Sequence, residues 1–185
     1  MTTPERRETG FPSAPAKVLV WDPVVRLFHW ITVFGCLGEL FIFEDGGAWH
    51  RGIGYAVAAA LVARMVWGFV GPRHARFADF VPSIPGLASY LADLARGREQ
   101  RFLGHNPAGA MMMILLMALL ASVSLTGWML SLDAFFGSES LEDAHETLAN
   151  SIVVLAGLHA GAALYESLRL RENLVLSMIT GYKRA

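Results

Sequence analysis

The chain has little cysteine. Its 185 residues include a single one, Cys36. One cysteine excludes disulfides, a multi-cysteine zinc site and iron–sulfur ligation within one chain. The sequence also lacks a Cys-x-x-Cys-His motif, so a covalently attached c-type haem is excluded.

Charge is scarce as well. Only 17% of the residues are charged, whereas a soluble domain carries about 25%. The net charge of −1 and the lack of a basic patch predict that the chain does not bind nucleic acid. In contrast, 54% of the residues are hydrophobic, and the mean hydropathy is +0.43. The apolar residues form long runs, which is typical of a membrane protein.

The first nineteen residues lack the apolar core of a secretory signal peptide. They are polar and contain Pro4, Pro12 and Pro15. We expect residues 1–19 to form a disordered cytoplasmic tail, followed by one transmembrane domain over residues 20–185.

Four apolar runs are long enough to cross a bilayer, which takes about 20 residues. The second run stops at Gly71-Pro72, and the third opens at Asn106-Pro107, where proline suits a first helical turn. The sequence therefore predicts an all-α membrane protein, a four-helix transmembrane bundle, with spans at about 24–43, 49–70, 106–130 and 141–168.

Loop charges predict the orientation of this bundle. Basic residues precede the first span, fill the long middle loop and follow the fourth span; they are Lys17, Arg26, Arg73, Arg76, Arg96, Arg98, Arg101, Arg169, Arg171, Lys183 and Arg184. The other two loops are acidic, through Glu44, Asp45, Asp133, Glu139, Glu142 and Asp143. The positive-inside rule then places the N- and C-termini in the cytoplasm. Within the middle loop, residues 85–94 predict a short amphipathic helix on the inner membrane surface.

Four histidines fall at two depths of the predicted bundle. His145 and His159 are fourteen residues apart, about 21 Å along a helix and on nearly the same face. His29 lies near the cytoplasmic start of the first span, and His50 lies at the periplasmic start of the second. Depth pairs His29 with His159 and His50 with His145. Neutral imidazole is a good axial ligand for haem iron. The pattern therefore predicts two stacked, non-covalent b haems that carry electrons across the membrane.

Two arginines are further candidates for cofactor binding. A lone histidine in an apolar helix is more often structural, but several costly ionisable groups at matching depths favour a functional site. Arg64 lies fourteen residues after His50, and a buried arginine needs a partner that haem propionates would supply. Arg26, one turn before His29, is a candidate for the same role. The alternatives are a quinone site for Arg64 and snorkelling to lipid headgroups for both.

Other polar or sulfur-containing residues are weaker candidates. His105 is expected to cap or line the start of the third span rather than to bind metal, and His74 is a weaker candidate still. Glu39 would serve a proton path at a quinol site or simply lie near the interface. The methionines at 111–113 and Met117 are interpreted as apolar filler.

Several segments together resemble the bacterial cytochrome b561 family, which includes b-type subunits of nickel–iron hydrogenases. The resemblance covers nearly the whole chain after the tail. It implies a four-helix bundle with two b haems and, by position, a ligand role for His29, His50, His145 and His159. Members couple quinone to periplasmic carriers, anchor dehydrogenases or pass electrons from superoxide to quinone; the short first periplasmic loop argues against the last. The segments that carry it are Val20-Trp21-Asp22-Pro23, Arg26-Leu27-Phe28-His29-Trp30, Trp49-His50-Arg51-Gly52-Ile53-Gly54-Tyr55, Arg64-Met65-Val66-Trp67-Gly68, Gly104-His105-Asn106-Pro107, His145-Glu146-Thr147-Leu148-Ala149-Asn150 and Gly157-Leu158-His159.

The expected function is electron transfer between the quinone pool and a periplasmic redox partner such as a c-type cytochrome. The expected location is the bacterial inner membrane, crossed several times, with the chain acting alone, as an oligomer or as a subunit of a complex. Whether it also has quinone oxidoreductase activity stays open. The first alternative is a haem-bearing membrane anchor subunit of a hydrogenase or dehydrogenase. The second is a small metal transporter whose histidines bind a transition metal.

Overall fold

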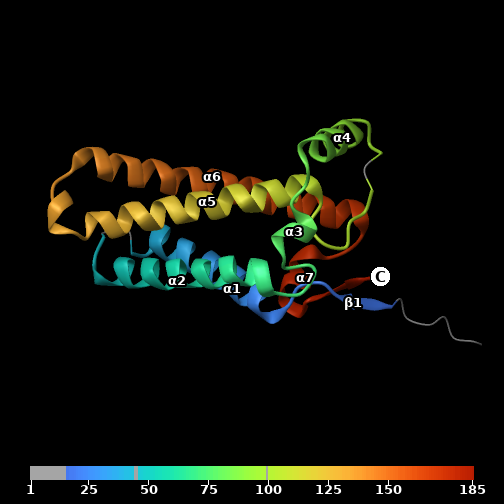
Figure 1. Cartoon of the computed structure of the whole chain (residues 1–185), viewed down its shortest axis with the longest axis horizontal. Coiled ribbons are helices and arrows are strands. Elements are labelled where there is room, and N and C mark those ends of the chain that lie inside the picture. The colour runs from blue at the N-terminus through green and yellow to red at the C-terminus, as the bar shows by residue number, and fades with distance from the viewer. Residues whose placement is uncertain (1–15, 44–45, 99) are drawn as a thin grey trace, which may run out of the picture.

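The computed structural model describes residues 16–43, 46–98 and 100–185, and four long helices dominate it (Figure 1). They are α1 (Pro23–Phe41), α2 (Ala48–Val70), α5 (Pro107–Leu130) and α6 (Glu139–Leu170). Each is long and apolar enough to cross a membrane. The predicted helical bundle with four spans is confirmed, and the boundaries differ from the prediction by about two residues.

Side-chain caps start the helices where the sequence places polar residues before proline. Asp22 accepts hydrogen bonds from the Val24 and Val25 amides at 2.9 and 3.3 Å and so begins α1. Asn106 accepts from the Gly109 amide at 2.7 Å and begins α5. Both caps satisfy amides that have no partner within their helix, and proline in the first turn loses no helical hydrogen bond.

The four helices form two layers, with α5 and α6 above α1 and α2 in the view of Figure 1. α1 packs on α2, α2 on α5, and α5 on α6. Their shared core consists of Val57, Leu61, Met117, Leu120 and Ile152. Within the described residues α1 and α6 do not form a comparable seam. Large apolar side chains on the outside, such as Phe34 and Leu168, suit a lipid surrounding.

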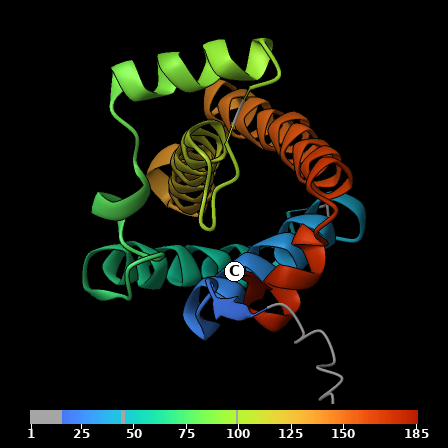
Figure 2. The ribbon, with the colours of Figure 1, turned by 90° about the vertical axis from the view of Figure 1, so that its right-hand side faces the viewer.

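Short elements gather at one end of the bundle, which we call the strand end (Figures 1 and 2). Strands β1 (Lys17–Leu19) and β2 (Tyr182–Arg184) pair antiparallel there, and α7 (Leu174–Thr180) leads into β2. Helices α3 (Phe77–Phe80) and α4 (Ile84–Ala95) lie between α2 and α5 in the chain. The opposite end, called the hairpin end, holds the α1–α2 and α5–α6 connections and the short helix η1 (Asp133–Phe135).

Part of the predicted disordered tail is ordered. The expectation of disorder over residues 1–19 is wrong for residues 17–19, because these form β1 against the C-terminal strand, with Lys17 opposite Arg184. The pairing supplies backbone partners that the local sequence does not reveal. The remaining tail up to residue 15, and the loop residues Glu44 and Asp45, lie outside the described residues. The helix predicted over residues 85–94 is present as α4, and its place on the inner membrane surface stays a prediction.

Candidate cofactor sites

His50 and His145 face each other at the hairpin end. Their ring centroids are 6.2 Å apart, with His50 in the first turn of α2 and His145 in the second turn of α6. Two metal–nitrogen bonds of about 2.0–2.1 Å on opposite sides of one ion would also place two imidazole ring centroids about 6 Å apart. The separation therefore suits two axial ligands of one metal ion.

Hydrogen bonds fix the orientation of both rings. Nδ1 of His50 donates to the Phe43 carbonyl oxygen at 3.0 Å, and a carbonyl can only accept. Nδ1 of His145 lies 2.9 Å from the Thr126 hydroxyl, which itself donates to carbonyls of the preceding turn of α5. Nδ1 of His50 thus carries the proton, and Nδ1 of His145 carries it when the Thr126 hydroxyl donates to a carbonyl. In this form the lone pair of Nε2 is left for a metal. This is the arrangement in which outer hydrogen bonds orient metal-binding histidines.

A cavity of about 330 Å³ contains these two histidines. Glycines on α2 and α5, Gly54 and Gly127, form part of its wall. A Cβ atom at Gly127 would lie 2.9 Å from Cε1 of the His145 ring. Any residue larger than glycine at this position would therefore crowd the ring. The rest of the lining is largely apolar and includes Val57, Ala58, Leu120, Val123, Trp128 and Ile152.

Glu39 lines the same cavity, as does Cys36. Oε1 of Glu39 lies 3.2 Å from the position that a Cβ atom of Gly54 would occupy. From the sequence, Glu39 was expected either to lie near the membrane interface or to serve a proton path at a quinol site. In the structure the half-buried carboxyl group is part of the wall around the His50–His145 pair.

His29 and His159 belong to the strand-end half of the bundle. They come from α1 and α6, which do not pack extensively on each other in the described chain, and His159 is close enough to His29 to act on it electrostatically. Nδ1 of His29 is buried, and no residue in the described part of the chain forms a hydrogen bond with it. Trp30 contacts the His29 ring edge-on at 5.0 Å, and its indole donates to the Met178 carbonyl at 3.2 Å.

Unpaired buried polar atoms are concentrated around this second pair. In a folded protein nearly all buried polar groups have a partner, so such a cluster calls for an explanation. In the described part of the chain these atoms are Oδ2 of Asp22, Nε of Arg26, Nδ1 of His29, Oγ1 of Thr32, Nη1 of Arg64 and Nδ1 of His105. Most are donors or can act as donors, which indicates a missing acceptor.

Arg64 lies inside the protein rather than reaching toward lipid headgroups. It is 1% exposed, donates from Nη2 to the Ala75 carbonyl at 3.1 Å and lies over the Phe77 ring at 5.1 Å. Asp22 is near enough to act on its charge, but the two form no ion pair in the described chain. A buried charge without a close counter-charge is costly, so the site suits an anionic group.

Arg26 is only partly satisfied. Its Nη1 donates to the Thr180 carbonyl at 3.4 Å, while Nε is buried and finds no partner within residues 16–43, 46–98 and 100–185. The structure thus places both predicted arginines at the strand end, together with His29 and His159. Met117 lies in the apolar core, as its interpretation as filler predicts.

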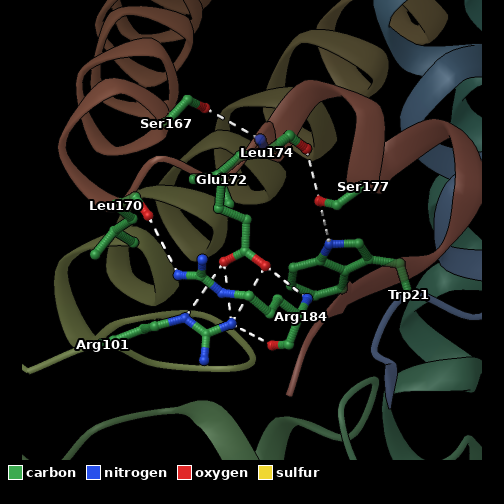
Figure 3. A network of polar contacts seen from close by, with 8 residues as sticks. All are labelled: Trp21, Arg101, Ser167, Leu170, Glu172, Leu174, Ser177 and Arg184. Atoms are coloured by element: carbon green, nitrogen blue, oxygen red, sulfur yellow. Dashed lines mark hydrogen bonds and ion pairs between the residues drawn. The ribbon is translucent and has the colours of Figure 1, made fainter. Parts of the chain in front are cut away.

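A polar network ties the C-terminal strand over the strand end (Figure 3). Glu172 accepts from Arg101 at 3.1 Å and from the Arg184 amide at 2.7 Å, and Arg101 also donates to the Arg184 carbonyl. Burial alone would raise the pKa of Glu172, but the hydrogen bonds from Arg184 and Arg101 and the nearby positive charges lower it. Glu172 is therefore ionised and fixes β2 in place.

Trp21 connects this network to the bundle. Its indole donates to the Ser177 hydroxyl at 3.2 Å (Figure 3), and Lys183 lies over its ring at 5.3 Å. Sequence reasoning missed the network, since Arg101 and Glu172 are 71 positions apart. It also missed Thr126, although a threonine within an apolar span was a signal that could have identified it.

The two histidine pairs fit a flat cofactor with two axial ligands better than a compact metal cluster. Among the described residues, no group of three or more His, Cys, Asp or Glu side chains is placed to hold a metal ion. Each pair instead offers two imidazoles from different helices, with apolar walls at the hairpin end and unpaired donors at the strand end. This donor set fits a haem iron.

Comparison with known proteins gives a consistent result. A family model described as prokaryotic cytochrome b561 matches residues 20–181. Three relatives carry the name probable Ni/Fe-hydrogenase B-type cytochrome subunit. The Rhodobacter capsulatus protein is 24% identical, covering 90% of this chain and 81% of its own. The Rhizobium leguminosarum bv. viciae protein is 26% identical, covering 89% of this chain and 87% of its own. The Azotobacter vinelandii protein is 23% identical, covering 90% of this chain and 88% of its own. No solved structure matches.

Proposed function

Because this chain belongs to the prokaryotic cytochrome b561 family, and is therefore a haem-bearing electron-transfer subunit of the bacterial inner membrane, we propose that it carries electrons through two b haems. His50 and His145 bind the iron of one haem at the hairpin end. His29 and His159 bind that of the other at the strand end. Arg64 and Arg26 bind carboxylates of the strand-end haem.

The observation that carries the proposal is the geometry of the His50–His145 pair. Both rings are held through Nδ1, 6.2 Å apart between centroids, and line a cavity of about 330 Å³. Structural histidines would be expected to use both nitrogens in hydrogen bonds. The strand-end pair is supported by the unpaired buried donors around it, which a haem with two carboxylates would satisfy.

Haem supplies reversible one-electron chemistry when bound between two histidines, with no open position for oxygen chemistry. The protein residues do the rest. Thr126 and the Phe43 carbonyl hold the hairpin-end rings in the metal-binding tautomer. Apolar residues of α2, α5 and α6 form much of the cavity wall. Arg64 provides positive charge in a site shielded from solvent.

The charge of the loops indicates how the protein is oriented in the membrane. The basic loops lie at the strand end, so the positive-inside rule makes this end cytoplasmic and the hairpin end periplasmic. Electrons would then pass between a periplasmic partner and the quinone pool. The names of the relatives favour a hydrogenase as that partner, with this chain as its haem-bearing anchor. A c-type cytochrome is the alternative. Family membership gives no support to a metal transporter.

Haem stoichiometry tests the proposal directly. We expect a pyridine haemochrome assay on the purified protein to give two b haems per chain. Acid acetone should remove both, since the chain lacks the cysteines for covalent attachment. A ratio near one would reject the second site, and a ratio near zero would reject the function.

Gly127 provides a sharper test of the hairpin-end site. Gly127→Val should displace the His145 ring and remove most of one haem, because even a Cβ atom would lie 2.9 Å from Cε1 of that ring. The absorbance of the reduced α-band should fall by about half. Gly52→Ala is the matched control, since a Cβ atom at Gly52 meets no atom within 4 Å. Full haem content in the Gly127 variant would show that His145 is not a ligand.

A further inference from the structure

The His105 side chain has a buried ring nitrogen, Nδ1, that is unpaired among the described residues. His105 lies two residues before α5 begins. Trp21 contacts the ring at 4.7 Å and Phe80 at 5.1 Å, so aromatic side chains fix its position. Trp21 is in turn held by Ser177 (Figure 3). A fixed ring with an unpaired buried nitrogen indicates a hydrogen-bond partner outside the described residues.

The charges around His105 indicate what that partner is. Burial lowers the pKa of His105 to about 3, and the positive charges of Lys183 and Arg64 lower it further in the same direction. The imidazole is therefore neutral and can donate one hydrogen bond. The groups that act on it are Lys183, Arg64, His159 and His74, and none of them is a carboxylate. These surroundings favour an anionic acceptor.

The location of His105 indicates which anion accepts its hydrogen bond. His159, one of the two histidines assigned to the strand-end haem, and Arg64, assigned to its carboxylates, both act on His105 electrostatically. Trp21, which contacts the His105 ring, packs in one cluster with Ala75, whose carbonyl accepts the hydrogen bond from Arg64. We propose that His105 is a third residue that binds a propionate of this haem, donating a hydrogen bond from Nδ1 to the carboxylate. This inference rests on the proposed function, since it requires haem between His29 and His159. It gives the buried donor an acceptor and the anion a further donor.

Two substitutions separate hydrogen bonding from packing. His105→Phe keeps an aromatic ring between Trp21 and Phe80 but removes the donor. His105→Gln keeps a donor but removes the ring. If His105 binds a propionate, H105F should lower the midpoint potential of one haem. Without this hydrogen bond the propionate keeps more of its negative charge, and that charge stabilises ferric iron relative to ferrous iron. We expect roughly a tenfold change in the reduction equilibrium, about 59 mV for a one-electron couple. H105Q should stay near wild type.

The opposite pattern would overturn the proposal. If His105 only packs, H105F should behave as wild type and H105Q should lose haem or shift its potential. His74→Phe is the matched control, because it changes a neighbouring histidine whose nitrogens are not among the unpaired buried atoms. It should leave both potentials unchanged. An equal shift in this control would count against a specific role for His105.

Infrared difference spectroscopy gives a reading that does not depend on activity. Haem with ¹³C-labelled propionates identifies the carboxylate bands in the redox difference spectrum of the full-length protein. We expect one labelled band to shift in H105F and to stay in place in H105Q. In the wild-type protein alone, labelled bands at the position of fully hydrated carboxylates would overturn the proposal. A haem-to-protein ratio of two in the same samples keeps this failure distinct from failure of the proposed function.

Discussion

Replacing His145 with alanine should remove one of the two haems and about half of the absorbance of the reduced α-band. The same haem should be lost from His50→Ala, because the two rings face each other at 6.2 Å and each offers a free Nε2. His29→Ala and His159→Ala should remove the other haem. Redox titration of each variant, followed by absorbance, identifies which of the two components remains.

The pairing is the informative part of this experiment. The remaining component should have the same potential in the His50 and His145 variants, and the other one should remain in the His29 and His159 variants. His74→Ala is the matched control and should retain both haems, since His74 lies in the α2–α3 connection, outside the four spans. If the His145 and His159 variants lost the same component, the assignment of ligands to the two ends would be wrong.

Replacing Arg64 with leucine should lower the midpoint potential of the strand-end haem and weaken its retention. Removing a nearby cation favours ferric iron, which carries one more positive charge than ferrous iron. Arg64 is 1% exposed, so solvent screens its charge little, and a tenfold change in the reduction equilibrium, about 59 mV, is expected. Potentiometric titration of the variant, together with its haem content, measures both effects.

Two further variants show whether the charge itself is responsible. Arg64→Lys keeps the positive charge, so its potential should lie between those of the wild type and the leucine variant. Arg76→Leu removes an exposed arginine that pairs with Asp79 at 2.7 Å, and it should change neither potential nor haem content. If Arg64→Leu kept both haems with unchanged potentials, Arg64 would be a structural residue that serves only the Ala75 carbonyl and the Phe77 ring.

The four membrane spans could be predicted from the sequence alone, because crossing a bilayer depends on the length and hydropathy of a local segment. Helix boundaries followed from local signals too, such as Asp22 before Pro23 and Asn106 before Pro107. The helical repeat also determined that His145 and His159 share one face of α6. Each of these properties is set by residues close together in the chain.

The tertiary structure decided what depends on residues far apart in the chain. It brought His50 beside His145 and placed the Thr126 hydroxyl, from a different helix, 2.9 Å from Nδ1 of His145. It buried Arg64 under α3 and left His105 with an unpaired nitrogen between Trp21 and Phe80. It also ordered residues 17–19 by pairing them with the C-terminal strand. No sequence pattern encodes these contacts, because a side chain's partner, and hence its protonation and role, depends on how separate helices pack.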